Sequence, residues 1–229
     1  MNQTVFAIFG LGFLLGLRHA LEPDHVVAVS TIVSRSKSIA RSSLAGTLWG
    51  LGHTTSLFIC GNVVLALRLT IPESFVARAE TAVAVMLVVL GVNALWQWAR
   101  ASKLHIHFHT HDERRHIHFH VHRSVETAVH THRHVFRVGI RSFLIGMVHG
   151  LAGSGALMIL VVTAVPSFLT GLIYILLFGL GSIGGMLLLS SVISIPFVLS
   201  ARRYHLFNNG LQLVTALLSI GVGLLWISL

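Results

Sequence analysis

The chain has 229 residues, of which 54% are hydrophobic and 10% are charged, and its mean hydropathy is +0.82. A soluble domain carries about 25% charged residues, so this composition is typical of an integral membrane protein. The 16 Lys and Arg outnumber the 7 Asp and Glu, but they lie in short clusters between apolar runs, a distribution that indicates membrane topology and excludes a nucleic-acid-binding function.

Six apolar segments are long enough to cross a bilayer, which takes roughly 20 helical residues. In chain order they cover 4–33, 43–67, 77–99, 138–164, 167–199 and 209–228. The first, fourth and fifth are longer than a straight span requires; tilt, a break or a re-entrant turn would each explain this, and the motifs below favour a break. The sequence therefore predicts an all-α integral membrane protein with six transmembrane helices.

The two halves of the chain resemble each other when Gly16 is aligned with Gly146. The alignment places GLRHALEPDH (16–25) over GMVHGLAGSG (146–155) and WGLGHTT (49–55) over FGLGSIG (178–184). Two halves of three spans each must run in opposite directions across the membrane, as in many secondary transporters. We therefore predict two inverted three-helix repeats, with the domain boundaries 1–99 for the first repeat, 100–137 for a His-rich loop and 138–229 for the second repeat.

Basic residues gather on one side of this arrangement. The loops 34–42, 100–137 and 200–208 share that side, and the opposite side receives only Arg68 and Arg78. By the positive-inside rule the basic side is cytoplasmic, which puts both termini outside. We expect a multi-pass protein of the cell inner (cytoplasmic) membrane whose His-rich loop lies in the cytoplasm.

Ionisable side chains inside a membrane are costly and are functional candidates by default. His19, Asp24 and His25 lie within seven residues of the first span. On an unbroken helix they would point in three directions, but Pro23 removes a backbone N–H and disfavours helical geometry at Glu22. An opened turn at this point would aim all three side chains inward.

His53 and His149 each lie within another apolar span, and we add them to the candidate metal ligands, although a packing role is the alternative for any single buried histidine. Two or three imidazoles with a carboxylate suit Ni²⁺, Co²⁺ or Zn²⁺ and suit Mg²⁺ or Ca²⁺ poorly. Glu22 and Ser154 are candidates for proton or metal coupling. For Glu22, metal coordination, proton transfer and pairing with Arg18 all stay open.

Eleven of the 16 histidines lie between His105 and His134. HIHFHTH (105–111) and HIHFHVH (116–122) alternate strictly around DERR, which is the pattern of a β-hairpin. With DERR as its loop, a hairpin would pair His111, His109, His107 and His105 with His116, His118, His120 and His122, in that order. Directly opposed histidines can share a metal ion. A disordered metal-binding tract is the alternative interpretation.

HALEPDH, from His19 to His25, resembles the H-x-x-x-x-D-H signature of the nickel/cobalt transporters, and LGHTT (51–55) is similar to their second histidine motif. The short chain and HGLAGSG (149–155) are most similar to the branch of urease-accessory-like nickel permeases. The resemblance implies that His19, Asp24 and His25 line a nickel or cobalt path, with His53 nearby. This chain departs from the family's uptake members at 30–31, where it has Ser and Thr in place of an Asp–Asn pair, so the direction of transport stays open.

We therefore expect a secondary transporter, and not an enzyme, that moves Ni²⁺ or Co²⁺ as its substrate through a midplane His/Asp site and needs no organic cofactor. The His-rich loop would capture metal. The expected partners are a divalent transition-metal ion and the lipid bilayer, and a homodimer is reasonable for so small a transporter. A membrane-anchored metal-storage or metal-sensing protein is the alternative, and a metal-dependent intramembrane enzyme is a third hypothesis.

Overall fold

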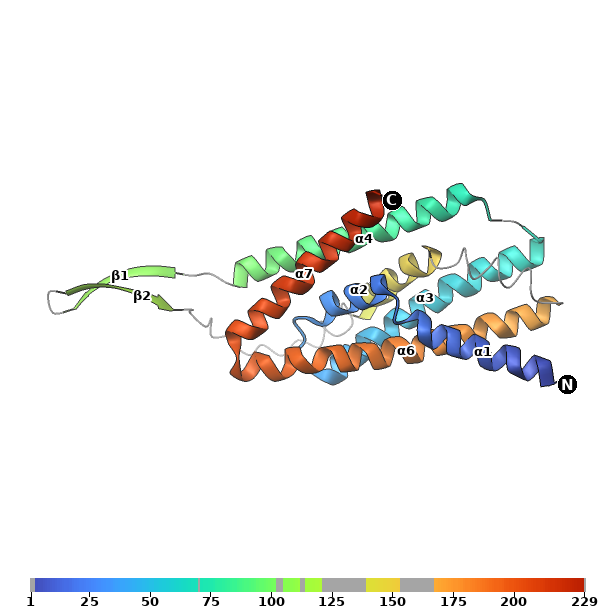
Figure 1. Ribbon diagram of the computed structural model, residues 1–229, viewed down its shortest axis with the longest axis horizontal. Helices are drawn as coiled ribbons and strands as arrows, with labels where there is room; N and C mark the ends of the chain where they lie inside the picture. Colours follow the sequence, from blue (N-terminus) through green and yellow to red (C-terminus); the bar gives the residue numbers. More distant parts are fainter. Residues whose placement is uncertain are drawn as a thin grey trace.

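The structure is a computed structural model that describes residues 3–69, 71–101, 105–111, 114–120, 139–152 and 167–228. It is an elongated helical bundle with a β-hairpin projecting from one end (Figure 1). The elements are α1 (Gln3–His19), α2 (Pro23–Val33), α3 (Ile39–Leu67), α4 (Glu73–Ala101), β1 (His105–His111), β2 (Arg114–His120), the helix Gly139–Ala152, α6 (Phe168–Arg203) and α7 (His205–Ser228).

Four helices of the described residues, α3, α4, α6 and α7, are long and apolar enough to cross a membrane. The helices Pro23–Val33 and Gly139–Ala152 are apolar but shorter. These lengths agree with an all-α membrane protein. Four of the six expected spans coincide with the long helices, whereas the first and fourth coincide with shorter ones.

The first apolar segment is broken where the sequence predicts it. α1 ends at His19 and α2 begins at Pro23, and Glu22 between them is extended, with φ −63° and ψ 147°. Proline is favoured in the first turn of a helix because the N–H that it lacks has no partner there in any case. Pro23 therefore starts a new helix, and the expected break is confirmed.

The hairpin forms, but the predicted register is wrong by two residues. His105, His107 and His109 pair with His120, His118 and His116, and His111 lies opposite Arg114. Only two residues separate the strands, and two-residue connections match the twist of antiparallel strands best. A slip of two positions keeps every residue on its face, so the alternating pattern alone could not distinguish the two registers. His122, which was expected to pair with His105, lies outside the described residues.

Glycines bring the helices into close contact. A Cβ on Gly16 of α1 would collide with the backbone of Phe178 of α6, and a Cβ on Gly146 would collide with the backbone of Trp49 of α3. α4 and α7 cross in the same way, since Gly91 meets the backbone of Ala216, and Gly223 meets that of Ala84. Small residues at such positions let membrane helices approach closely.

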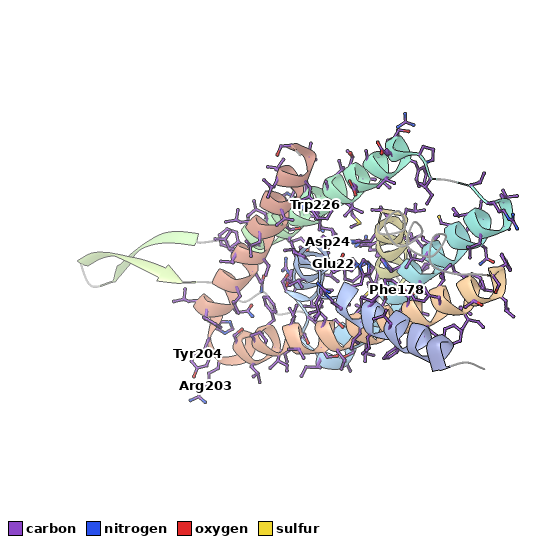
Figure 2. The ribbon with its side chains drawn as sticks, turned by 45° about the vertical axis from the view of Figure 1, so that its right-hand side comes forward. Glu22, Asp24, Phe178, Arg203, Tyr204 and Trp226 are labelled. Atoms are coloured by element: carbon purple, nitrogen blue, oxygen red, sulfur yellow. The ribbon has the colours of Figure 1, made fainter. Side chains whose placement is uncertain are left out.

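The two ends of the bundle differ. α4 runs into the hairpin at its C-terminus, and the junction between α6 and α7 lies at the same end, which we call the hairpin end (Figure 1). The starts of α4 and α6 lie at the opposite end. Asp24 and Phe178 lie between these ends, whereas Arg203 and Tyr204 lie at the hairpin end (Figure 2).

Candidate metal centre

The break between α1 and α2 brings the three residues of the HALEPDH motif together. His19 is the last residue of α1, and Asp24 and His25 lie in the first turn of α2. The rings of His19 and His25 have centroids 4.5 Å apart. Across the bundle, His19 Nε2 lies 3.2 Å from Nε2 of His53 on α3.

Asp24 links the first half of the chain to the second. Its Oδ1 is hydrogen-bonded to Nδ1 of His25 at 3.0 Å, and its Oδ2 to Nε2 of His149 at 2.6 Å. His149 belongs to the helix Gly139–Ala152. One carboxylate therefore holds two imidazoles that come from different halves of the chain.

Within the described residues, these side chains form two groups able to hold a metal ion. The first comprises His19, His25 and His53, the second comprises Asp24, His25 and His149, and within each group the ligand atoms lie within 4.8 Å of one another. His25 is common to both. We call the five residues the His/Asp centre, and all the metal ligands expected within the spans belong to it.

The centre is buried and incompletely hydrogen-bonded. His25 and His53 are 0% exposed and His149 is 1% exposed. His25 Nε2, His53 Nδ1 and His149 Nδ1 have no hydrogen-bond partner. More than 90% of buried polar groups have one, so three unpaired nitrogens in one cluster are unusual.

Aromatic rings flank the centre. Trp49 is stacked on His25 with centroids 5.4 Å apart and meets His149 edge-on at 5.4 Å, and Phe178 lies 5.4 Å from His19. Sequence reasoning aligned Trp49 with Phe178 but gave neither a role. The available signal was the spacing of four between Trp49 and His53, which places both on one face of α3.

Glu22 and Ser154 were the candidates for proton or metal coupling. Glu22 Oε2 lies 3.0 Å from His19 Nδ1, and the Glu22 side chain is 53% exposed. Glu22 therefore contacts a candidate metal ligand. Ser154 lies outside the described residues.

Ser30 and Thr31, at the position of the family's Asp–Asn pair, make packing contacts. Their hydroxyls donate to backbone carbonyls of α2, and the hydroxyl of Thr31 also donates to Thr215 O on α7 at 3.3 Å.

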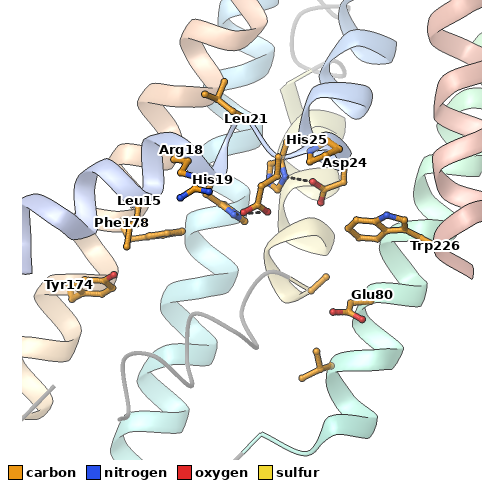
Figure 3. Close-up of a pocket in the computed structure, with 14 residues that line it drawn as sticks. Leu15, Arg18, His19, Leu21, Asp24, His25, Glu80, Tyr174, Phe178 and Trp226 are labelled. Atoms are coloured by element: carbon orange, nitrogen blue, oxygen red, sulfur yellow. Dashed lines mark hydrogen bonds and ion pairs between the residues drawn. The ribbon is translucent and has the colours of Figure 1, made fainter. Parts of the chain in front are cut away.

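A cavity of about 770 Å³ adjoins the centre (Figure 3). Its polar lining includes Arg18, Glu22, Asp24, His25 and Glu80. Glu80 lies on α4 and was absent from the sequence candidates. No motif surrounds Glu80, and only the packing of α4 beside α2 brings it to the cavity.

The amino-acid sequence is similar to known membrane-transport and accessory proteins. A family model described as high-affinity nickel-transport protein matches residues 5–229. The urease accessory protein UreH of Bacillus sp. (strain TB-90) is 40% identical over 225 residues, which are 98% of this chain and 92% of that protein.

Two chloroplast proteins of Arabidopsis thaliana are also similar. FOR GROWTH AND FERTILITY 1 and FOR GROWTH AND FERTILITY 2 are 28% and 24% identical over 93% of this chain, but the match covers 56% and 54% of their lengths. The chain therefore spans about half of each of these two relatives. No solved structure matches.

Proposed function

Because the chain belongs to the family described as high-affinity nickel-transport protein, we propose that it is a secondary transporter that carries Ni²⁺ or Co²⁺ across the membrane through the His/Asp centre. The family supports nickel transport in general. The finer proposal rests on one observation, which is that two groups of ligand atoms share the buried His25.

The spacing of the ligand atoms supports a first-row metal ion as cargo. Such an ion binds imidazole nitrogen at about 2.1 Å, so two ligands at right angles around it lie about 3.0 Å apart. His19 Nε2 and His53 Nε2 are 3.2 Å apart, and His25 Nδ1 and Asp24 Oδ1 are 3.0 Å apart. Both separations match that spacing, and imidazole with carboxylate suits Ni²⁺ and Co²⁺.

Protons compete with the metal at this centre. The same nitrogen and oxygen atoms that would bind the ion share hydrogen bonds in its absence, and metal binding to histidine requires the neutral ring and releases protons. Exchange of the ion for protons would couple transport to the proton gradient. The membrane potential is the other available driving force.

We further propose that the membrane part consists of two inverted repeats, 1–99 and 138–229. The glycine contacts support this: Gly16 packs on Phe178 and Gly146 on Trp49, and the sequence alignment pairs Gly16 with Gly146 and Trp49 with Phe178. The two contacts are therefore equivalent, with the roles of the two halves exchanged. The two crossing contacts of α4 and α7 are related in the same way.

The repeats differ in their ligands. Ser182 occupies the position aligned with His53, and its hydroxyl donates to the carbonyl of Gly16 at 3.2 Å. His149 is the ligand that the second half contributes among the described residues. The first half therefore supplies most of the proposed site.

We propose that the segment 100–137 is a cytoplasmic metal-capturing loop of an inner-membrane protein. The hairpin supports this by opposing three histidine pairs, and a metal bridging each pair would add the stability that two isolated strands lack. A metal-storage or metal-sensing protein is the second candidate, favoured by the same loop. We also propose a homodimer, on the basis of the small size of the chain alone.

The test is radioactive Ni²⁺ and Co²⁺ flux into proteoliposomes. His25→Ala is expected to abolish flux, because His25 belongs to both ligand groups. His205→Ala is the matched control, since His205 is an exposed histidine at the start of α7. Parental flux in His25→Ala would refute the centre. Loss of flux on deleting 104–134, with His25→Ala still active, would favour the storage or sensing function.

A further inference from the structure

Three of the seven acidic residues of this basic chain line one cavity. Of its 7 acids, three lie at Asp112, Glu113 and Glu126, and the other four are Glu22, Asp24, Glu73 and Glu80. Three of those four, all except Glu73, line the cavity beside the His/Asp centre. Arg18 is the basic residue in this lining, so the carboxylates outnumber it.

The cavity belongs to the end of the bundle opposite the hairpin. Val76 and Glu80 lie in the first turns of α4, and Trp226 lies in the last turn of α7. α4 leads into the hairpin only at its other terminus, Ala101. In Figure 3, Glu80 and Trp226 project from these helices toward the side of the cavity where Asp24 lies.

Apolar packing covers the centre on its hairpin side. Trp49, one turn nearer the hairpin end than His53 along α3, is stacked on His25 and is 1% exposed. Ala28, Val29 and Val33 of α2 join Trp49 in one buried cluster. The centre is therefore covered toward the hairpin end and adjoins the cavity toward the opposite end.

We propose that this cavity is the vestibule through which a hydrated divalent metal ion reaches the His/Asp centre, and that Glu80 is the carboxylate that recruits the ion. The inference rests on the proposed transport function, and it adds Glu80 as a recruiting residue and the face opposite the hairpin as the side from which the ion enters. His25 supports it independently, because it lines the cavity, is 0% exposed and has an unpaired Nε2.

The three carboxylates differ in burial, from two exposed side chains to a buried one at the centre. Glu80 and Glu22 are exposed, whereas Asp24 is 6% exposed and bonded to two histidines of the centre. Carboxylates lining a cleft raise the local concentration of cations and the rate of their capture, and added salt weakens this effect. A hydrated ion would meet Glu80 first and would exchange its water for imidazole only at the centre.

The second half has no equivalent charge. Gly91 and Gly223 hold equivalent positions where α4 and α7 cross. If the two halves are aligned on these glycines, Glu80 is aligned with Gln212. Gln212 is neutral, and its amide donates to Asn208 Oδ1. Recruitment by Glu80 therefore acts at one face only.

The experiment compares Glu80→Gln with Glu73→Gln in proteoliposomes of known orientation. Both variants remove one carboxylate from the start of α4, but Glu73 is outside the cavity. With Ni²⁺ added at the face opposite the hairpin and at low salt, Glu80→Gln should raise the apparent KM about threefold or more, and Glu73→Gln should leave it unchanged. Added salt should shrink the difference, and Glu80→Asp should restore most of the parental KM.

Equilibrium Ni²⁺ binding to the detergent-solubilised variants separates the two proposals. Parental binding together with a raised KM supports recruitment by Glu80. Parental KM in Glu80→Gln, while the parent transports, overturns the vestibule and leaves the proposed function standing. A parent protein that moves no Ni²⁺ or Co²⁺ overturns the proposed function itself.

Cysteine labelling tests the face independently. In a Cys60→Ser background, Val76→Cys should react with a membrane-impermeant thiol reagent applied opposite the hairpin. Ser190→Cys is the control, because Ser190 is 1% exposed and lies in the half of α6 nearer the hairpin end. Labelling of Val76→Cys from the hairpin face alone overturns the proposed direction of opening.

Discussion

Asp24 Oδ2 and His149 Nε2 lie 2.6 Å apart, although 125 positions separate the two residues in the chain. The contact joins α2 to the helix Gly139–Ala152, so the geometry of the centre depends on both halves being docked. Because the same carboxylate also bonds His25, it orients two candidate ligands at once.

Asp24→Asn should therefore weaken metal binding more than the loss of one ligand implies. An amide has one acceptor oxygen, so it cannot accept from both imidazoles through separate oxygens as the carboxylate does. We expect the Kd for Ni²⁺ to rise about 10- to 100-fold, as measured by calorimetry on the solubilised protein. Glu73→Gln, which removes an acid outside the cavity, should bind as the parent does. An unchanged Kd in Asp24→Asn would remove Asp24 from the centre.

Metal binding should weaken as the pH falls. Protonated imidazole cannot bind a metal, so each ligand histidine that gains a proton must lose it again before the ion enters. The affinity for Ni²⁺ should therefore fall as the pH is lowered. Proton release on Ni²⁺ binding, measured in weakly buffered solution, gives the stoichiometry. Binding that is independent of pH would contradict a histidine centre.

Gly16→Ala and Gly146→Ala should destabilise the protein to a similar degree. In each variant the new methyl group would collide with a backbone carbonyl, of Phe178 or of Trp49, and overpacking of this kind costs about 1–3 kcal/mol. Gly184→Ala is the control, because no heavy atom lies within 4 Å of a Cβ at that position. Thermal unfolding in detergent measures all three. A loss of stability in Gly184→Ala equal to that of the other two would show that close packing is not the cause.

The register of the hairpin can be read from metal stoichiometry. Replacing His107 and His118, which are partners in the strand register, should remove one bound Ni²⁺ ion, because it breaks one opposed pair. Replacing His107 and His116 breaks two pairs and should remove two ions. Equilibrium dialysis counts them. Equal losses in the two double variants would contradict this register.

Local patterns carried most of what could be predicted. Pro23 marked the break in the first span, and motif spacing identified His19, Asp24 and His25, which the structure brings together with His53 and His149. Ser154 and His122 fall outside the described residues, so their roles stay predictions.

Other features depend on packing between distant segments. Glu80 in the sequence is an ordinary acid near the start of an apolar helix, and only the position of α4 beside α2 gives it a cavity to line. Trp49 likewise gains its place from the ring of His25. The hairpin register was mistaken because a two-residue slip preserves the pattern from which it was inferred.

The continuous helix α4 also fixes an electrical distance. From Glu80 to its end at Ala101 it rises about 30 Å, which is the thickness of the hydrocarbon core. An ion at Glu80 and an ion at the hairpin would therefore lie at the electrical potentials of opposite sides of the membrane. In the proposed orientation, with the hairpin end cytoplasmic and the interior negative, a divalent ion crossing toward the hairpin would gain about 4.6 kcal/mol per 100 mV. At equal metal concentrations on the two sides, inward movement would then run on voltage alone, whereas outward movement would need at least that much work from another gradient, such as that of exchanged protons.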